Sequence, residues 1–311
     1  MDESVLVTHE LVKTYPGKRG ARANDGINMS AKAGQVVGVL GHNGAGKTTL
    51  VNQIVGLLRP DSGTIRLAGV DAVAHPAKAR QLASVQAQAN VPITGLTPRR
   101  AVELVGRIRG LRKQVARERA GTLIDALDLG QWADTPAEKI SGGVARLTAF
   151  AMAAVDPGKL VVLDEPTNDV DPARRRLLWS AIRTLADDGA AVLLVTHNVR
   201  EAEHTVDELI VLDRGRVLAA GSPAELTAHL RNTLTLDIDA PRVPELPNGL
   251  FGQETGPAQS AVTVPAARGA EAVAWAQRAV EHGDIERFSL TAASLEDVYL
   301  DLVGSERAVA V

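Results

Sequence analysis

Short apolar runs alternate with helical stretches along the first two thirds of the chain. Runs with the length and β-branched content of strands lie at residues 4–11, 36–40, 64–70, 159–165, 190–197, 208–215 and 216–221. Three of them, beginning at residues 36, 160 and 190, are apolar at each of their first four positions, which is typical of parallel strands covered on both faces. The pattern therefore predicts an α/β fold with a parallel-sheet core.

A charged amphipathic pattern replaces these runs between residues 98 and 130. Thr97 precedes it as a good N-cap, and Pro98 occupies the first helical position, where proline is tolerated. We therefore expect an α-helical subdomain at about residues 89–140, inserted into the α/β region.

A third composition begins after residue 231. The stretch "TLTLDID" alternates as a strand does, and a Pro/Gly-rich linker follows it. Beyond the linker we expect a strand at "AVTVPA", a helix at "GAEAVAWAQRAVEHG", a strand at "IERFSLT" and a helix at "SLEDVYLDLVG". The sequence thus predicts a first domain over residues 1–231 and a small α+β domain over residues 232–311.

Composition narrows the classes of function. The chain has 311 residues, 45% of them hydrophobic, and a net charge of −3, so no global basic field favours nucleic acid as a partner. It has no cysteine, which excludes disulfides and thiolate metal sites. The acidic start lacks the pattern of a secretory signal, and no apolar run reaches the roughly 18 residues of a bilayer span. We expect a cytoplasmic protein whose membrane role, if it has one, depends on a partner.

The segment "GHNGAGKTT" carries the strongest chemical signal. It follows the apolar run 36–40 and precedes a helical pattern, which is the strand–loop–helix context of a phosphate-binding loop. Glycines let backbone N–H groups face a phosphate, Lys47 supplies a cation to the β and γ oxygens, and Thr48 offers a hydroxyl to Mg²⁺. The predicted ATP-binding loop is Gly41, His42, Asn43, Gly44, Ala45, Gly46, Lys47, Thr48 and Thr49.

Two acidic residues end the buried run near residue 160. Ligands of open α/β sheets bind outside the carboxyl ends of the strands, which is where Asp164 and Glu165 are expected. Asp164 is predicted to hold Mg²⁺, and Glu165 to polarise the water that attacks the γ-phosphate. A merely polar strand terminus is the alternative, and the phosphate loop earlier in the chain favours the catalytic interpretation.

Two further side chains are candidates for the γ-phosphate. His197 ends the run 190–197, where it could contact the phosphate and hold Glu165 and the water. Gln88 lies where the α/β core gives way to the helical subdomain, and its amide oxygen could complete the metal shell or sense the phosphate. Gln86 is a second possibility for that role, and a solvated loop amide is the alternative.

The segment "ISGGVARL" places a serine and two glycines directly before an apolar run. A turn that leads into a helix N-cap explains such a string. A backbone surface that a phosphate can approach closely also explains it, with a helix beginning near Val144.

Taken in order, "GHNGAGKTT", "ISGG", "LVVLDEPTNDVD" and "VTHNVREAE" resemble the motifs of the ATPase subunit of ATP-binding cassette (ABC) transporters, over about residues 4–231. This resemblance implies a P-loop NTPase nucleotide-binding domain with an antiparallel β subdomain beside the parallel core. It also implies that Tyr15 stacks on adenine, that Gln88 is preferred over Gln86, and that Asp171 is the aspartate of the D-loop. A core aromatic is the alternative for Tyr15.

The resemblance also implies partners and cofactors. Two ATPase subunits, identical or different, would assemble head to tail, so that Ser141, Gly142 and Gly143 of one meet the γ-phosphate held by the other. The cofactors would be ATP and Mg²⁺. The assembly would lie on the inner face of the membrane through an integral-membrane permease, and the helical subdomain would push on that permease.

The C-terminal segment narrows the subclass. "SLEDVYLDLVG" is similar to the closing helix of drug-exporter ATPases of the daunorubicin-resistance type, although it is also simply a capped amphipathic helix. The ATPase of an importer is the alternative within the family. Val144 stands where the commonest family signature has glutamine, and valine cannot form a hydrogen bond through its side chain.

Two other classes of protein are alternatives to a transporter subunit. Soluble ABC-type ATPases of DNA repair, chromosome structure or translation usually carry two cassettes or a long coiled coil, whereas only 94 residues separate Lys47 from Ser141 and no sustained heptads lie between them. A non-hydrolysing regulator would be expected to lack Glu165 or His197, and both are present.

Overall fold

The computed structural model describes residues 4–16, 21–89, 93–198, 203, 205–240, 247, 254–255, 261–299 and 302. The chain forms two compact units, Met1–Ala220 and Gly221–Val311. This division falls between residues 220 and 221, whereas the sequence predicts a domain boundary after residue 231. The boundary between independently folding domains stays a prediction.

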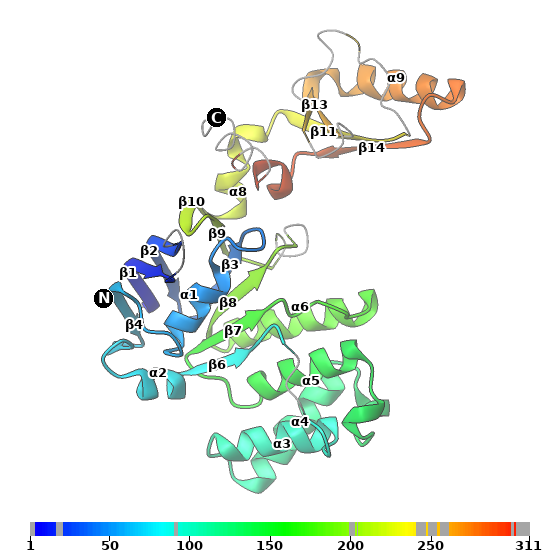
Figure 1. Ribbon diagram of the computed structural model, residues 1–311. Helices are drawn as coiled ribbons and strands as arrows, with labels where there is room; N and C mark the ends of the chain where they lie inside the picture. The colour runs from blue at the N-terminus through cyan, green and yellow to red at the C-terminus, as the bar shows by residue number, and fades with distance from the viewer. Residues whose placement is uncertain are drawn as a thin grey trace. The chain divides into compact units, whose positions relative to one another are not determined.

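A six-stranded sheet forms the centre of the first unit, in the order β10-β9-β3-β8-β7-β6. Its strands are β3 (Val36–Leu40), β6 (Ala83–Gln86), β7 (Leu160–Asp164), β8 (Ala191–Thr196), β9 (Glu208–Asp213) and β10 (Arg216–Gly221). The pairs β9–β3, β3–β8, β8–β7 and β7–β6 are parallel. Every residue of β3, β7 and β8 is buried, so the predicted parallel core is confirmed (Figure 1).

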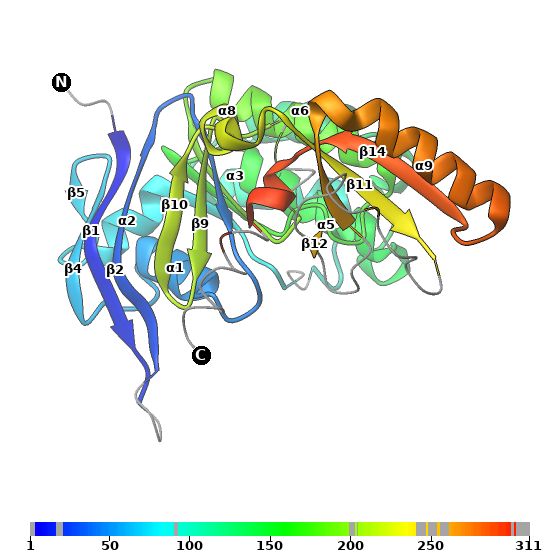
Figure 2. The same ribbon diagram turned by 90° about the horizontal axis from the view of Figure 1, so that it is seen from above.

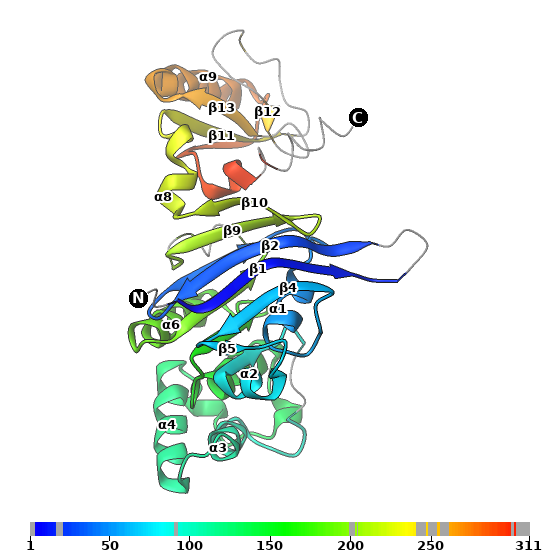
Figure 3. The ribbon, with the colours of Figure 1, turned by 90° about the vertical axis from the view of Figure 1, so that its left-hand side faces the viewer.

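A four-stranded sheet in the order β2-β1-β4-β5 lies beside it, and its pairings are antiparallel (Figure 3). The strands are β1 (Ser4–Thr14), β2 (Arg22–Lys32), β4 (Ser62–Leu67) and β5 (Val70–Asp71). Apolar side chains from both sheets join those of α1 (Lys47–Ile54) in one core, among them Leu6, Ile27, Val39, Leu50 and Leu193. This core holds the loop between β3 and α1 in position, because the strand and the helix at the two ends of the loop are both buried in it.

The other helices in the described part of the first unit are α2 (Pro76–Leu82), α3 (Pro98–Ile108), α4 (Lys113–Ala126), α5 (Gly142–Ala154) and α6 (Pro172–Asp187), with 3-10 turns at Gly130–Trp132 and Ala137–Lys139. α3, α4 and α5 pack on one another as the predicted helical subdomain (Figure 1). Thr97 caps α3 by accepting a hydrogen bond from the backbone N–H of Arg100, as predicted. None of the helices in the described part of the chain has both the length and the apolar character needed to cross a bilayer.

The second unit is a small α+β structure, as predicted. Its sheet has the order β12-β13-β11-β14, formed by β12 (Glu254–Thr255), β13 (Ala261–Pro265), β11 (Thr233–Asp239) and β14 (Arg287–Ala292). α9 (Gly269–His282) packs on this sheet through Ala272 and Ala276 (Figure 2). The shorter elements are α8 (Pro223–Leu226) and the 3-10 turns Ala228–Leu230 and Ala266–Arg268. The final helix expected at 294–304 is helical over 295–299, and much of the rest lies outside the described residues.

Some details differ from the sequence-based expectations. Strands β2, β6 and β12 were not predicted, and β12 lies in the stretch expected to be a linker. The single strand expected at residues 64–70 is divided between β4 and β5. The helix expected to begin near Val144 begins two residues earlier, at Gly142, because Ser141 is its N-cap. After His197, residues 199–202 and 204 lie outside the described residues, and residues 205–207 form a turn that leads into β9.

Candidate active site

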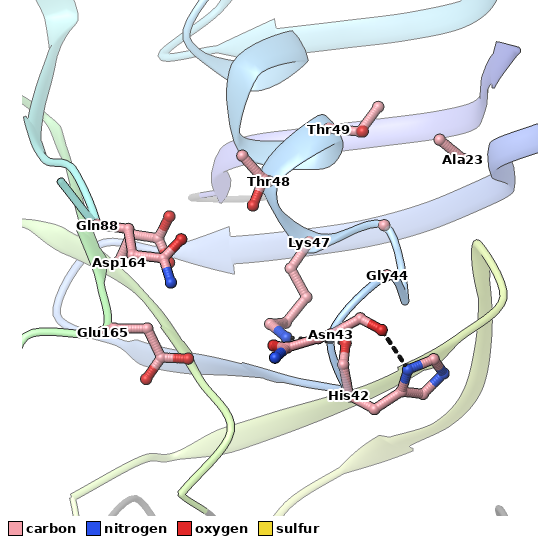
Figure 4. A pocket seen from close by; sticks show the side chains of 11 residues that line it. Ala23, His42, Asn43, Gly44, Lys47, Thr48, Thr49, Gln88, Asp164 and Glu165 are labelled. Atoms are coloured by element: carbon pink, nitrogen blue, oxygen red, sulfur yellow. Dashed lines mark hydrogen bonds between the residues drawn. The ribbon is translucent and has the colours of Figure 1, made fainter. Parts of the chain in front are cut away.

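One pocket of the first unit gathers residues from distant parts of the chain. The phosphate loop forms one side of it, and Gln88, Asp164 and Glu165 lie on the other (Figure 4). The carboxyl ends of β3 and β7 bring the two sides together, because both strands run parallel to β8 between them. The residues that line the pocket are Ala23, His42, Asn43, Gly44, Gly46, Lys47, Thr48, Thr49, Gln88, Asp164 and Glu165.

The shape of the phosphate loop depends on two glycines. Gly44 and Gly46 have φ angles of 90° and 107°, in the left-handed region that favours glycine. A Cβ atom on Gly46 would also fall on the carbonyl oxygen of Ala23. At these two positions no side chain covers the backbone of the loop. A phosphate can therefore approach the N-terminus of α1, which attracts negative charge.

Lys47 and His42 fix the two ends of this loop. The Nζ of Lys47 donates to the carbonyl oxygens of Gly41, at 2.5 Å, and His42, at 3.1 Å. Burial lowers the pKa of Lys47, while Glu165 and Asp164 oppose that shift. The Nε2 of His42 lies 2.5 Å from Oδ1 of the buried Asp213. The loop thus holds a buried ammonium group beside two carboxylates.

Glu165 is held in one orientation from several sides. It is 3% exposed and has a φ of 51°, and its N–H donates to the carbonyl oxygen of Val195 at 2.8 Å. Thr196 Oγ1 donates to Glu165 Oε2 at 3.2 Å, and His197 Nδ1 lies 2.7 Å from Oε1. A left-handed non-glycine residue stores strain that is common at functional sites. Residues at the end of the neighbouring strand β8 therefore orient the carboxylate of Glu165, which the sequence predicts to activate water.

Asp164 has a raised pKa. Burial and the neighbouring charge of Glu165 raise the pKa of Asp164 from 3.8 to about 6, against the opposing charges of Lys47 and Arg146. A second positive charge, such as a divalent cation, would favour its ionised form.

Without nucleotide or metal, Asp164→Asn is expected to raise the melting temperature at about pH 8, and the gain is expected to vanish toward pH 4. The pKa of Asp164 is about 6 in the folded chain and 3.8 as its ordinary value. The protonated carboxyl therefore contributes its full stability below about pH 3.8, and this contribution is lost as the pH rises through about 6. Thermal unfolding of both proteins at several pH values measures this. A melting-temperature difference that is independent of pH would contradict it.

The donor set of the pocket fits Mg²⁺ with ATP. Thr48, Gln88 and Asp164 offer a hydroxyl, an amide oxygen and a carboxylate, the oxygen ligands that this hard cation prefers. No group of three or more His, Cys, Asp or Glu side chains is placed to hold a metal within the described ranges. The few protein ligands suit a cation that is bound together with substrate phosphates.

The structure separates the two candidate glutamines. Gln88 lines the pocket, whereas Gln86 is 1% exposed in β6 and donates from Nε2 to the carbonyl oxygen of Arg146 at 3.2 Å. Tyr15 is 43% exposed beside the pocket, and its hydroxyl lies 3.5 Å from Thr49 Oγ1. An exposed ring in this position is available for stacking and is not part of the core.

Ser141 and Gly142 are exposed at the start of α5, and neither lines the pocket. Ser141 Oγ accepts a hydrogen bond from the N–H of Val144, and the Val144 side chain is buried in its own chain. Asp171 caps α6 by accepting from the N–H groups of Ala173 and Arg174. These residues therefore lie outside the lining of the pocket in their own chain.

Close packing within the chain requires a glycine at position 143. A Cβ atom there would fall on the carbonyl oxygen of Asp169, whereas one on Gly142 would meet the Asp169 side chain at an ordinary 3.7 Å. Gly143→Ala is expected to lower the free energy of unfolding by about 1–3 kcal/mol through overpacking. Urea unfolding measures this, with Gly142→Ala as the matched control. Equal losses in the two variants would contradict the close-approach argument.

Several contacts at the site were not predicted from sequence. Asp213 pairs with His42 across 171 residues, and Asn24 donates to the carbonyl oxygen of Gly46 from the unpredicted β2. The guanidinium of Arg146 donates hydrogen bonds to the carbonyl oxygens of Ala87 and Gln88. The one sequence signal that could have drawn attention to Arg146 is that it is the only charged residue of α5.

Comparison with known proteins places these features in a family. The family model described as "ABC transporter" matches residues 24–168. The chain is 37% identical over 309 residues to the daunorubicin/doxorubicin resistance ATP-binding protein DrrA of Streptomyces peucetius, covering 96% of this chain and 92% of that protein. It is 38% identical over 205 residues to the Nod factor export ATP-binding protein I of Ralstonia nicotianae, covering 66% of this chain and 64% of that protein.

The fold has solved counterparts. The structure of an ATP-binding subunit of an ABC transporter superposes with a TM-score of 0.66 at 25% identity, covering 72% of this chain and 92% of the other. The predicted fold class, with its parallel core, antiparallel subdomain and helical subdomain, is thereby confirmed.

Proposed function

This chain belongs to the ABC transporter ATP-binding family, and we propose that it hydrolyses ATP to power the export of a drug or another small amphiphile through a separate permease. The family match and the relatives named for drug resistance and Nod factor export support this function. The observation that carries the ATPase assignment is the convergence of Lys47, Asp164 and Glu165 in one pocket.

Each side chain has a chemical role in this proposal. Lys47 would exchange its loop carbonyls for the β and γ oxygens of ATP. Glu165 would accept a proton from the attacking water, and His197 would hold that carboxylate and contact the γ-phosphate. Tyr15 would stack on adenine.

Thr48, Gln88 and Asp164 would hold Mg²⁺. The cation would neutralise charge on the phosphates when bound. Asp164 must be ionised to bind it, and its pKa of about 6 leaves it ionised near neutral pH. Gln88, at the edge of the helical subdomain, would respond to the presence of the γ-phosphate.

The site would be completed by a second ATPase subunit. The exposed Ser141 and Gly142 lie at a helix N-terminus, and Gly143 has no side chain, so a phosphate could approach all three. A head-to-tail homodimer or heterodimer would place them, with the D-loop of Asp171, against the partner's ATP. Within each subunit, residues 1–231 would form the nucleotide-binding domain and 232–311 an accessory domain.

Coupling to transport requires the permease. Because no described helix could span a bilayer, the membrane path would belong to that partner, and the chain would act from the cytoplasmic face. No nucleic acid is expected as a partner, since the net charge is −3.

Isolation from detergent-solubilised native membranes tests the transport assignment. We expect an integral-membrane protein to copurify, and phosphate release to rise when the two are reconstituted with the transported compound. ATP hydrolysis without any copurifying membrane protein would instead favour an ATPase that is not coupled to transport.

A further inference from the structure

Arg146 joins the helix that begins with Ser141 to the segment that carries Gln88. It lies in α5 and is 4% exposed. Its Nη1 donates to the carbonyl oxygen of Ala87 at 3.0 Å and its Nη2 to that of Gln88 at 2.6 Å. In return, Gln86 Nε2 donates to the carbonyl oxygen of Arg146 at 3.2 Å. Three hydrogen bonds thus fix residues 86–88 to one turn of α5.

These bonds connect two surfaces with different neighbours. The side chain of Gln88 lines the nucleotide pocket of its own chain, whereas Ser141 and Gly142 are exposed at the start of the same helix. Arg146 follows Ser141 by five residues, or about 8 Å along a helix. Because α5 is one continuous helix from Gly142 to Ala154, its exposed start and Arg146 belong to the same element.

We propose that Arg146 is a positioning residue that couples the two ATP sites of the dimer. It does so by keeping Gln88 in fixed relation to the Ser141–Gly143 segment of its own chain. This inference rests on the proposed function, since it requires a site completed by a second subunit. ATP held by the partner orders the start of α5, and Arg146 then sets Gln88 for the ATP held in its own chain. Coupling between sites is reciprocal, so binding at either site favours the other.

The forked guanidinium is required for this role. It donates from two nitrogens to two successive carbonyl oxygens, which the single ammonium group of lysine cannot reproduce in the same geometry. We call these two hydrogen bonds the Arg146 clamp. Because a buried charge is costly unless it is hydrogen-bonded, the clamp also favours the packing of residues 86–88 against α5.

The chain offers a matched control in Arg109, which follows α3. It binds the chain just before residues 86–88, where α2 ends and β6 begins, by donating to the carbonyl oxygens of Ala83 at 3.2 Å and Gln81 at 3.4 Å. Arg109 does not line the nucleotide pocket. Loss of either clamp weakens packing around β6, but only the Arg146 clamp reaches Gln88.

The test measures initial rates of phosphate release against ATP concentration for the full-length chain, Arg146→Met, Arg146→Lys and Arg109→Met. The wild-type rate should be sigmoidal, with a Hill coefficient above 1. Arg146→Met should bring the coefficient to 1 and lower kcat about 10-fold or more, with a smaller change in KM. Arg109→Met should keep the wild-type coefficient and stay within about twofold of its kcat.

Thermal unfolding of each variant separates folding from coupling. If Arg146→Met does not fold, Arg146→Lys takes its place, and it should also lose the sigmoidal response. A wild-type coefficient of 1, or equal kinetics in the Arg146 and Arg109 variants, would overturn the inference while leaving the ATPase intact. Absence of phosphate release from the wild type would contradict the proposed function itself.

Discussion

Glu165→Gln is expected to stop ATP hydrolysis and to leave ATP binding intact. The amide has nearly the same size as the carboxylate and can still contact Thr196 and His197, but it cannot accept a proton from water. Because positioned acid–base groups contribute about 10²- to 10⁴-fold to a rate, phosphate release should fall by at least about 100-fold. Single-turnover phosphate release and equilibrium ATP binding measure the two effects separately.

Glu225→Gln is a suitable control for this experiment. Glu225 forms a capping box with Ser222 at the start of α8, in the other compact unit, so its loss should leave kcat unchanged. Turnover at the wild-type rate in Glu165→Gln would show that another group activates the water.

Lys47→Ala is expected to abolish turnover at the earlier step, because ATP binds more weakly and its γ-phosphate lacks the cation that holds it. Lys47 is the only lysine or arginine among the described residues that line the pocket, and burial already keeps its ammonium group away from water. A hydrogen bond to a charged group contributes about 1.5–3 kcal/mol. Its loss should therefore weaken ATP binding about 10- to 100-fold.

Titration calorimetry with ATP and Mg²⁺ measures this affinity. Lys13→Ala is the control, because Lys13 pairs with Asp61 outside the pocket and should bind ATP as the wild type does. Wild-type affinity in Lys47→Ala would mean that ATP does not occupy this loop.

The sequence predicted those parts of the fold in which local pattern and tertiary role agree. Strands β3, β7 and β8 are continuous apolar runs, and each is buried at every residue. β2 was missed because it contains Asn24, Asp25, Gly26 and Asn28, residue types that are uncommon in strands. The start of α5 was misplaced because two glycines disfavour a helix locally, while the Ser141 cap stabilises it.

The site was predictable in most of its residues and in one of its contacts. The phosphate-loop pattern and the acidic strand end identify Lys47, Asp164 and Glu165 without a structure. The contact of His197 with Glu165 was expected, because both residues end apolar runs of the parallel core. The hydrogen bond from Arg146 to the carbonyl oxygen of Gln88 and the pairing of His42 with Asp213 were not expected, and they join residues 58 and 171 positions apart. Such pairs depend on which strands are neighbours, and periodicity along one chain carries no information about that order.

The mass of Glu165→Gln in solution, measured by light scattering with ATP and Mg²⁺, tests the central claim most directly. If the site is completed by Ser141, Gly142 and Gly143 of a second subunit, the ATP-bound variant should have twice the mass of the monomer. The mass should return to that of a monomer when Ser141→Arg is added, because the larger side chain occupies the exposed start of α5. A Glu165→Gln protein that binds ATP and stays monomeric would contradict the two-subunit site.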